Sequence, residues 1–267
     1  MDKITSRQNA RVKELVKLRD RSHRDKMSKF LIEGSRELLA AKNSKIYVEE
    51  LYWCSEFGSA ARREKTLKEF EKSNTQLIET TREVFEKFSN RKSPDGILGV
   101  GWYEKKSLED YPFKSDLPLI LILEGVEKPG NLGAILRSAD CAGVDLVLCS
   151  DMAVDIYNPN VIRSSQGQVF SVPLICAPNE WILEFLREEQ IEIIVSTPSA
   201  KDPIWSQTMN GAIAIVMGSE KEGVSDFWMN GSFHLAKIPQ FGGSDSLNLA
   251  AATIVFLYEA NRQRVLS

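Results

Sequence analysis

The sequence predicts an α/β protein with a small N-terminal domain and a larger C-terminal domain that contains a parallel sheet. Apolar strand-like runs alternate with helical patterns along the 267 residues. Two runs, at 119–123 and 212–217, are almost continuously apolar, as a parallel sheet covered on both faces requires. A charged stretch with Pro112, at 104–116, is typical of a linker. We therefore expect domains at 1–103 and 117–267.

The first domain begins with a basic amphipathic pattern and a polar turn over residues 5–29. A strand is expected at 30–33, followed by a helix that opens at Gly34 and Ser35, where the Ser35 hydroxyl can cap the helix. Further along, the pattern predicts strands at 46–53, 76–78 and 96–102, and helices at 59–72 and 81–88.

The second domain alternates more regularly between the two periodicities. Strands are expected at 119–123, 145–149, 191–196, 212–217 and 233–238. Helical patterns cover 131–142, 160–166, 180–189 and the closing segment of the chain. In a parallel sheet of this kind, ligand-binding loops are expected at the carboxyl ends of the strands.

Composition argues against several classes of protein. The apolar runs are far shorter than the roughly 18 to 20 residues that span a bilayer, and the first residues lack the apolar core of a secretory signal. We expect a cytoplasmic protein without a membrane partner. The four cysteines form no CxxC pair, and only two histidines occur, so neither a metal site nor a histidine-dependent catalytic triad is expected.

Charge is distributed unevenly along the chain. Residues 1–103 hold 22 Lys and Arg against 16 Asp and Glu, a net charge of +6, whereas the remainder holds 12 against 21, a net charge of −9. A basic first half suits a polyanion, because Lys and Arg near phosphates release condensed counterions. The alternative for each basic run is a solvated helix face.

Three strand-to-loop junctions carry the candidate chemistry, namely 131–137, 217–223 and 238–264. In the third, a Gly-rich polar loop runs into an apolar helix, where backbone amides converge and where Ser246 and Asn248 can orient a ligand. Helix capping is the alternative role for these two residues. The GxGxxG fingerprint and the Walker lysine are missing, which argues against NAD and nucleotide-triphosphate sites.

Together the three junctions resemble the SpoU/TrmH-type RNA ribose 2'-O-methyltransferases of the SPOUT superfamily. The matching motifs are NLGAILRSADCAGVDLVL, IVMGSEKEGVS and IPQFGGSDSLNLAAATIVFLYEANRQ, in that order within residues 119–264. The segment NPNVIRSSQG, with Arg163, matches a further family segment. The first hundred residues, especially FLIEGSRELLAA, resemble the family's N-terminal RNA-binding domain, which has a ribosomal-protein-like α/β fold.

The resemblance implies a C-terminal domain tied into a trefoil knot, a bent S-adenosylmethionine cofactor and a homodimer. It assigns cofactor contacts to the backbone of Gly218, Ile238 and Leu247. In the catalytic group, Arg137 acts on the ribose hydroxyl, Asn131 and Glu220 orient groups, and Ser246 and Asn248 shape the pocket. The basic first half and the family segment nominate four RNA-binding residues: Arg7, Arg11, Arg36 and Arg163.

The expected reaction is methyl transfer from S-adenosylmethionine to an RNA 2'-hydroxyl, with 23S ribosomal RNA as the expected substrate. The role of Arg137 is open, because a guanidinium is a poor base and stabilisation of the developing alkoxide is an equally suitable task. A surface pair between Arg137 and Asp140 is the structural alternative. A transfer RNA or base methyltransferase and a non-catalytic ribosome-assembly protein are the alternative functions.

Overall fold

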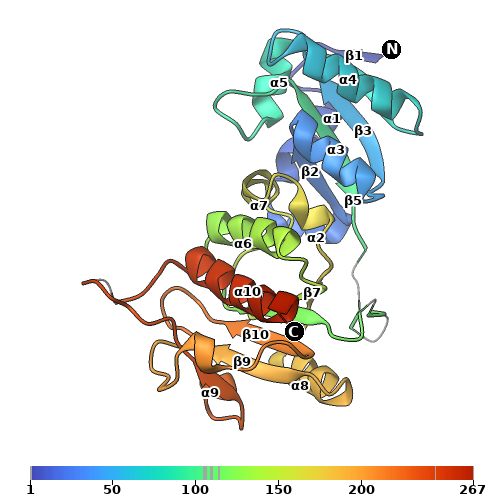
Figure 1. Ribbon diagram of the computed structural model, residues 1–267. Helices are drawn as coiled ribbons and strands as arrows, with labels where there is room; N and C mark the ends of the chain where they lie inside the picture. Colours follow the sequence, from blue (N-terminus) through green and yellow to red (C-terminus); the bar gives the residue numbers. More distant parts are fainter. Residues whose placement is uncertain (1, 105–106, 109–110, 114, 244, 267) are drawn as a thin grey trace. The chain divides into compact units, whose positions relative to one another are not determined.

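The computed structural model describes residues 2–104, 107–108, 111–113, 115–243 and 245–266 (Figure 1). The chain divides into two compact units. Unit 1 comprises Met1–Glu104 and Asp155–Ser171, and unit 2 comprises Lys105–Val154 and Val172–Ser267. The second segment of unit 1 is therefore an excursion from the C-terminal half of the chain.

A mixed sheet of five strands forms the centre of unit 1, in the order β1-β4-β3-β5-β2. β4 pairs in parallel with β1 and β3, whereas β5 pairs antiparallel with β3 and β2. The strands are β1 (Asp2–Ile4), β2 (Lys29–Glu33), β3 (Val48–Trp53), β4 (Gln76–Thr80) and β5 (Ile97–Trp102).

Helices cover both faces of this sheet. α1 (Ala10–Lys17) and α5 (Arg82–Phe88) bury apolar side chains against one face, and α3 (Ser35–Asn43) and α4 (Ala60–Glu71) pack together on the other. Gly99 in β5 permits the close approach of α3, because a Cβ there would lie 2.6 Å from the Leu38 side chain. The small α/β fold expected for this part of the chain is confirmed.

Two local predictions in unit 1 are wrong. The basic pattern over 5–29 forms two helices, α1 and α2 (Arg21–Met27), and not one, because the chain turns at Leu18 and Asp20 becomes the N-cap of α2. Ser35 does not cap α3, since Gly34 is the N-cap and Ser35 is the first helical residue. The amide of Ser35 donates instead to the carboxylate of Asp95 at 3.1 Å.

The excursion contains α7 (Pro159–Ser164) and the 3-10 helix η1 (Gln168–Phe170). An ion pair joins Asp155 to Arg24, whose side chains are only 11% and 2% exposed. The ring of Tyr157 stacks on Phe30 with centroids 4.6 Å apart. These contacts hold α7 against the sheet of unit 1.

Six parallel strands form the sheet of unit 2, in the order β11-β9-β10-β6-β7-β8. Their bounds are β6 (Leu119–Glu124), β7 (Leu146–Ser150), β8 (Leu174–Cys176), β9 (Glu192–Ser196), β10 (Ile213–Met217) and β11 (His234–Ala236). The two nearly continuous apolar runs pair with each other at the centre, with Leu123 opposite Met217. The predicted parallel sheet is confirmed.

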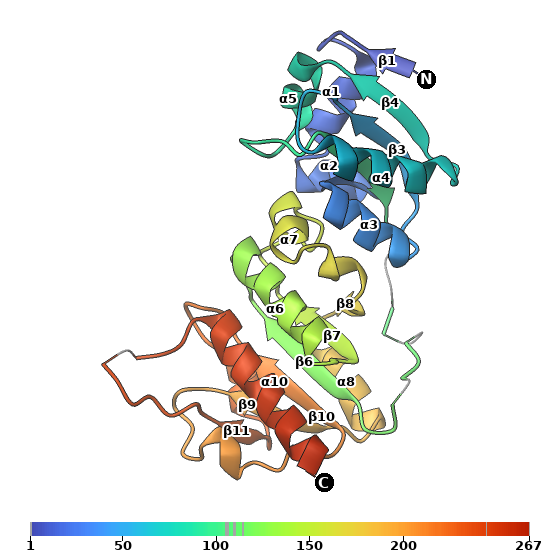
Figure 2. The ribbon, with the colours of Figure 1, turned by 45° about the horizontal axis from the view of Figure 1, so that its top comes forward.

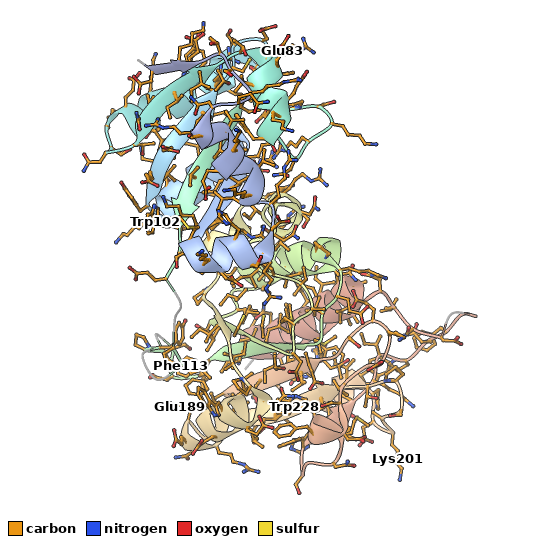
Figure 3. All side chains as sticks on the ribbon, turned by 180° about the vertical axis from the view of Figure 1, so that it is seen from behind. Glu83, Trp102, Phe113, Glu189, Lys201 and Trp228 are labelled. Atoms are coloured by element: carbon orange, nitrogen blue, oxygen red, sulfur yellow. The ribbon has the colours of Figure 1, made fainter. Side chains whose placement is uncertain are left out.

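Alternate residues of these strands face two different cores. On one face, Ile120, Ile122, Ala214 and Val216 pack with α8 (Asn179–Glu188) and α9 (Asp226–Met229) around the fully buried Trp228, which Figure 3 labels. On the opposite face, α6 (Pro129–Cys141) and α10 (Leu249–Leu266) lie side by side (Figures 1 and 2). A short 3-10 helix, η2 (Ile204–Ser206), contacts α10.

The predicted linker at 104–116 lies partly outside the described residues. In its described part, Leu108 is buried in the core of unit 2 and Tyr111 and Phe113 pack against it. The Tyr111 hydroxyl donates to the carbonyl oxygen of Asp145 at 2.5 Å. These three side chains belong to unit 2, while the functional division into domains and the trefoil knot stay predictions.

Helices able to cross a lipid bilayer are missing from the described part of the chain, since none combines enough length with enough apolar character.

Replacement of Asp155 by Asn should destabilise unit 1, because it leaves the buried Arg24 guanidinium without its counter-ion. We expect a loss of about 3 kcal/mol or more in the free energy of unfolding. Urea unfolding followed by circular dichroism measures this loss. Glu86→Gln, which removes an exposed i,i+4 partner of Arg82, is the control and should change stability by about 0.5 kcal/mol or less. Equal effects of the two substitutions would contradict the importance of the buried pair.

Candidate active site at the carboxyl ends of the parallel strands

The first motif follows β6 and forms the start of α6. Gly125 turns the chain with φ at +66°, a left-handed conformation that glycine adopts without strain. Pro129 then occupies the first helical position, where its missing amide hydrogen costs no hydrogen bond. This arrangement places Asn131 in the first turn of α6 and Arg137 farther along the same helix.

The second motif follows β10 and forms a closed turn. Ser219 and Gly223 exchange backbone hydrogen bonds of 2.9 and 3.1 Å, which fold residues 219–223 back on themselves. Gly218 has no room for a side chain, because a Cβ there would lie 2.1 Å from the backbone of Gly223. The turn therefore fixes the position of Glu220.

A chain of side-chain hydrogen bonds joins all three motifs. The amide of Asn131 donates to the Glu220 carboxylate, and the amide of Asn248 donates to Oδ1 of Asn131 at 3.2 Å. The Asn248 Oδ1 also accepts from the amide of Ala250 at 3.0 Å, so this residue caps α10 as well. Three of the five predicted catalytic residues are thus in contact, although their catalytic roles are untested.

One carboxylate oxygen of Glu220 accepts the hydrogen bond from Asn131, and the other has no partner among the described residues. Its Oε2 atom is buried and makes no hydrogen bond to any residue that the structure describes. A buried carboxylate oxygen without a donor is costly, because burial removes it from water. The motif junction therefore offers an acceptor to a ligand that can donate a hydrogen bond.

Arg137 lies on a different side of α6 from Asn131. The two are six residues apart, which places them about 120° apart around the helix axis. Arg137 is exposed, and within the described ranges its side chain makes no hydrogen bond or ion pair, the alternative pair with Asp140 included. The guanidinium is thus available to a ligand.

The other predicted site residues come from the segment between β11 and α10 and from the turn after β10. Ser246 and Leu247 are exposed just before α10, Ile238 is partly buried, and Gly218 is buried. Backbone hydrogen bonds among the described residues do not join Gly218, Ile238 and Leu247 to one another. Their assignment to the cofactor stays a prediction.

A buried polar cluster beside the motifs escaped the sequence analysis. Glu124, the last residue of β6, accepts hydrogen bonds from the Asn179 side chain at 2.6 Å and from the backbone and hydroxyl of Ser225 at 2.7 Å. Asn179 in turn accepts from the indole of Trp228 at 3.1 Å. The sequence signal that could have revealed this cluster is Glu124, an acidic residue at the end of an otherwise apolar strand. The cluster ties the end of β6 to the last residue of the second motif.

The four predicted RNA-binding arginines all lie in unit 1. Arg7 donates to the carbonyl oxygen of Glu83 at 2.9 Å, and Arg11 lies 3.7 Å from the carboxylate of Glu50. Arg36 at the start of α3 and Arg163 in α7 are exposed. Metal-binding groups of three or more His, Cys, Asp or Glu are not found in the described part of either unit.

Comparison with known proteins agrees with this geometry. The model of the SpoU rRNA Methylase family matches residues 118–258, more than half of the chain, and these residues include the first two motifs and the third motif as far as Tyr258. The chain belongs to this family. Residues 9–99 match a second model, described as an MRM3-like substrate binding domain.

Individual members of the SpoU family resemble the chain closely. The 23S rRNA (guanosine-2'-O-)-methyltransferase RlmB of Escherichia coli K12 is 38% identical over 163 residues, which cover 61% of this chain and 67% of that protein. A solved RNA 2'-O ribose methyltransferase superposes with a TM-score of 0.85 at 36% identity and covers 98% of this chain and 99% of that one. An AdoMet-bound rRNA methyltransferase from Sinorhizobium meliloti gives a TM-score of 0.88 at 25% identity and covers 98% and 97%.

Replacement of Glu124 by Ala should destabilise unit 2, because the Asn179 side chain and the Ser225 amide and hydroxyl lose a buried acceptor. We expect a loss of about 2 to 4 kcal/mol in the free energy of unfolding, measured by urea denaturation with tryptophan fluorescence. Glu222→Ala removes a carboxylate that is 80% exposed and serves as the control. If Glu124→Ala lowered the free energy of unfolding no more than Glu222→Ala does, the stabilising role of the Glu124 hydrogen bonds would be contradicted.

Proposed function

We propose that this protein transfers a methyl group from S-adenosylmethionine to a ribose 2'-hydroxyl of ribosomal RNA. The observation that supports this most directly is the hydrogen-bonded chain from Glu220 through Asn131 to Asn248, which unites the three family motifs at one edge of the sheet. The relatives named above carry this activity in their descriptions, and one of them has AdoMet bound.

The residues at the motif junction fit such a cofactor. The buried Oε2 of Glu220 needs a hydrogen-bond donor, and the exposed stretch before α10 offers backbone groups at Leu247. We assign contacts with the cofactor to the backbone of Gly218, Ile238 and Leu247. Bound there, S-adenosylmethionine supplies a sulfonium methyl group that an oxygen nucleophile can attack.

In this proposal, the protein contributes position and charge. Asn131 is held at both ends by hydrogen bonds, so it presents a fixed amide beside Glu220. Arg137 stabilises the negative charge that develops on the ribose oxygen, a role that its permanently charged guanidinium performs better than proton removal. Ser246 and Asn248 shape the pocket, and Asn248 also caps α10.

The substrate that we propose is 23S ribosomal RNA, on the basis of the named Escherichia coli relative. Unit 1 would bind the RNA through its basic residues, among them Arg7, Arg11, Arg36 and Arg163. We place the activity in the cytoplasm, where ribosomal RNA is found.

The proposed enzyme is a homodimer with a knotted C-terminal domain. The helix α10 is apolar on two sides, since Phe256 and Leu257 are buried in the core whereas Ile254, Val255 and Tyr258 are exposed. A helix that is apolar on both sides needs a second covering surface. We assign that surface to a second copy of the chain.

Labelled S-adenosylmethionine and a 23S rRNA transcript test the reaction. After digestion of the RNA to nucleosides, we expect the label on a ribose 2'-oxygen, because the assigned site presents an arginine to a hydroxyl nucleophile. Chromatography of the nucleosides against standards makes the assignment. Label found only on a base carbon or nitrogen would contradict ribose chemistry.

Replacement of Arg137 by Ala should lower kcat by at least about tenfold, because the transition state loses an electrostatic contact. Single-turnover assays with saturating S-adenosylmethionine measure this step. Arg187→Ala, which removes an exposed arginine from α8 on the opposite face of the sheet, is the matched control. Unchanged turnover in the Arg137 variant would remove this residue from the mechanism.

A further inference from the structure

Two of the four cysteines lie side by side at the edge of the unit 2 sheet. Cys149 in β7 is paired in register with Cys176 in β8, the outermost strand on that side (Figure 2). Beside the pair, the backbone amide of Ala177 donates to the carbonyl oxygen of Cys149 at 3.0 Å. The strand pairing thus brings together two cysteines that flank the excursion in the sequence.

Both cysteine side chains point to the same face of the sheet. Their neighbours Leu148 and Ile175 belong to the apolar core that packs against α8. Since successive residues of a strand point to opposite faces, Cys149 and Cys176 both point to the face on which α6 lies. Their thiols are hydrogen-bonded to each other.

The spacing of the two strands suits a disulfide. Neighbouring strands of a sheet lie about 4.7 to 4.9 Å apart, and disulfides join residues whose Cα atoms are about 4.4 to 6.8 Å apart. Cys149 and Cys176 are Cα partners in the parallel pairing, and their thiols are already in contact. A bond between the two sulfur atoms therefore requires no change in the register of β7 and β8.

The two thiols differ in their access to solvent. Cys149 is only 1% exposed, whereas Cys176 is exposed. The hydrogen bond with Cys176 and burial raise the pKa of the Cys149 thiol, so Cys149 keeps its proton. A protonated Cys149 can donate to Cys176, which favours the thiolate form of Cys176. An oxidant in solution therefore meets Cys176 first.

Packing alone does not account for this pair. Cys54 shows what a packing cysteine looks like, since it is 1% exposed within the apolar core of unit 1. Cys176 fills no such core, because it is exposed on an edge strand. An exposed thiol held against a second, buried thiol is instead the arrangement of a reactive cysteine and its resolving partner.

We propose that Cys149 and Cys176 form a reversible disulfide when the protein meets hydrogen peroxide. The Cys176 thiolate attacks one peroxide oxygen, the O–O bond breaks, and hydroxide leaves, which gives a sulfenic acid. The Cys149 sulfur then attacks the sulfenic sulfur, the S–O bond breaks, and the departing hydroxide takes up the Cys149 proton as water. In total, two thiols lose two electrons to one peroxide, and the products are one disulfide and two waters.

This disulfide closes a loop that contains the whole excursion. The chain leaves β7 after Ser150, passes through Asp155–Ser171 in unit 1 and returns to unit 2 at β8. Cys149 and Cys176 stand at the two ends of this path. Because a cross-link removes conformational freedom from the unfolded chain, the oxidised protein should resist unfolding better than the reduced protein.

Thiol counting and peptide mapping test the proposed disulfide. We expect hydrogen peroxide to remove two of the four free thiols of the wild-type protein, and dithiothreitol to restore them. Mass spectrometry of unreduced peptides should find Cys149 linked to Cys176. In the Cys149→Ser variant, dimedone should label a sulfenic acid at Cys176 that no thiol resolves. Cys141→Ser removes the other exposed thiol and is the matched control, which should still form the disulfide.

Two results would overturn the proposal. One is a wild-type protein that keeps all four thiols after peroxide treatment or that links Cys176 to a second molecule. The other is equal dimedone labelling of the wild-type protein and the Cys149→Ser variant, because Cys149 would then not be the resolving thiol. Circular dichroism checks that each variant is folded.

Urea unfolding followed by tryptophan fluorescence tests the closure of the excursion. The midpoint of the oxidised wild-type protein should exceed that of the reduced protein by about 0.5 M or more, and Cys176→Ser should show no peroxide-dependent shift. An unchanged midpoint in a protein with the mapped disulfide would contradict this effect on stability. These measurements use neither RNA nor S-adenosylmethionine, so their outcome is independent of the proposed function.

Discussion

The parallel, in-register pairing of β6 with β10 is the constraint on which the candidate site depends. Leu123 lies opposite Met217, so the two strands end at the same level and the first two motifs begin beside each other. Side chains 89 residues apart in sequence can then share a hydrogen bond, as Asn131 at the start of α6 and Glu220 in the turn after β10 do. A shift of one residue in this pairing would reverse the faces of one strand and separate the motifs.

Two hydrogen-bonded groups stabilise that edge of the sheet. The chain through Asn131 joins the motif side chains to one another, and the cluster around Glu124 ties the strand end to Ser225 and Asn179. The closed turn at 219–223, made possible by Gly218, fixes the spacing between the two groups. The edge is therefore built largely before a ligand binds, which lowers the entropic cost of binding.

The sequence predicted the central features of the fold because they depend on local patterns. Continuous apolar runs identified β6 and β10, and the glycines and polar residues of the three junctions identified the candidate site. Features that depend on tertiary contacts were missed. The three-residue strands β1 and β8 are too short for a periodic signal, and Ser35 lost the role of cap because Gly34 adopts φ +117° and Asp95 accepts from the Ser35 amide. The spacing of residues along the sequence also cannot reveal that α7 packs in unit 1. That packing depends on contacts with Arg24 and Phe30, which lie more than a hundred residues earlier in the chain.

The placement of residues 155–171 in unit 1 has a consequence for biosynthesis. The chain leaves unit 1 after Glu104, returns at Asp155 and leaves again after Ser171. During translation the N-terminal portion emerges first. Asp155, the counter-ion of Arg24, is synthesised 131 residues later. Until the nascent chain has extended past that excursion, a guanidinium destined for the interior remains hydrated at the surface of an incomplete intermediate. Synthesis can therefore begin unit 1 early but can complete it only after about a third of unit 2, residues 105–154, has also left the ribosome.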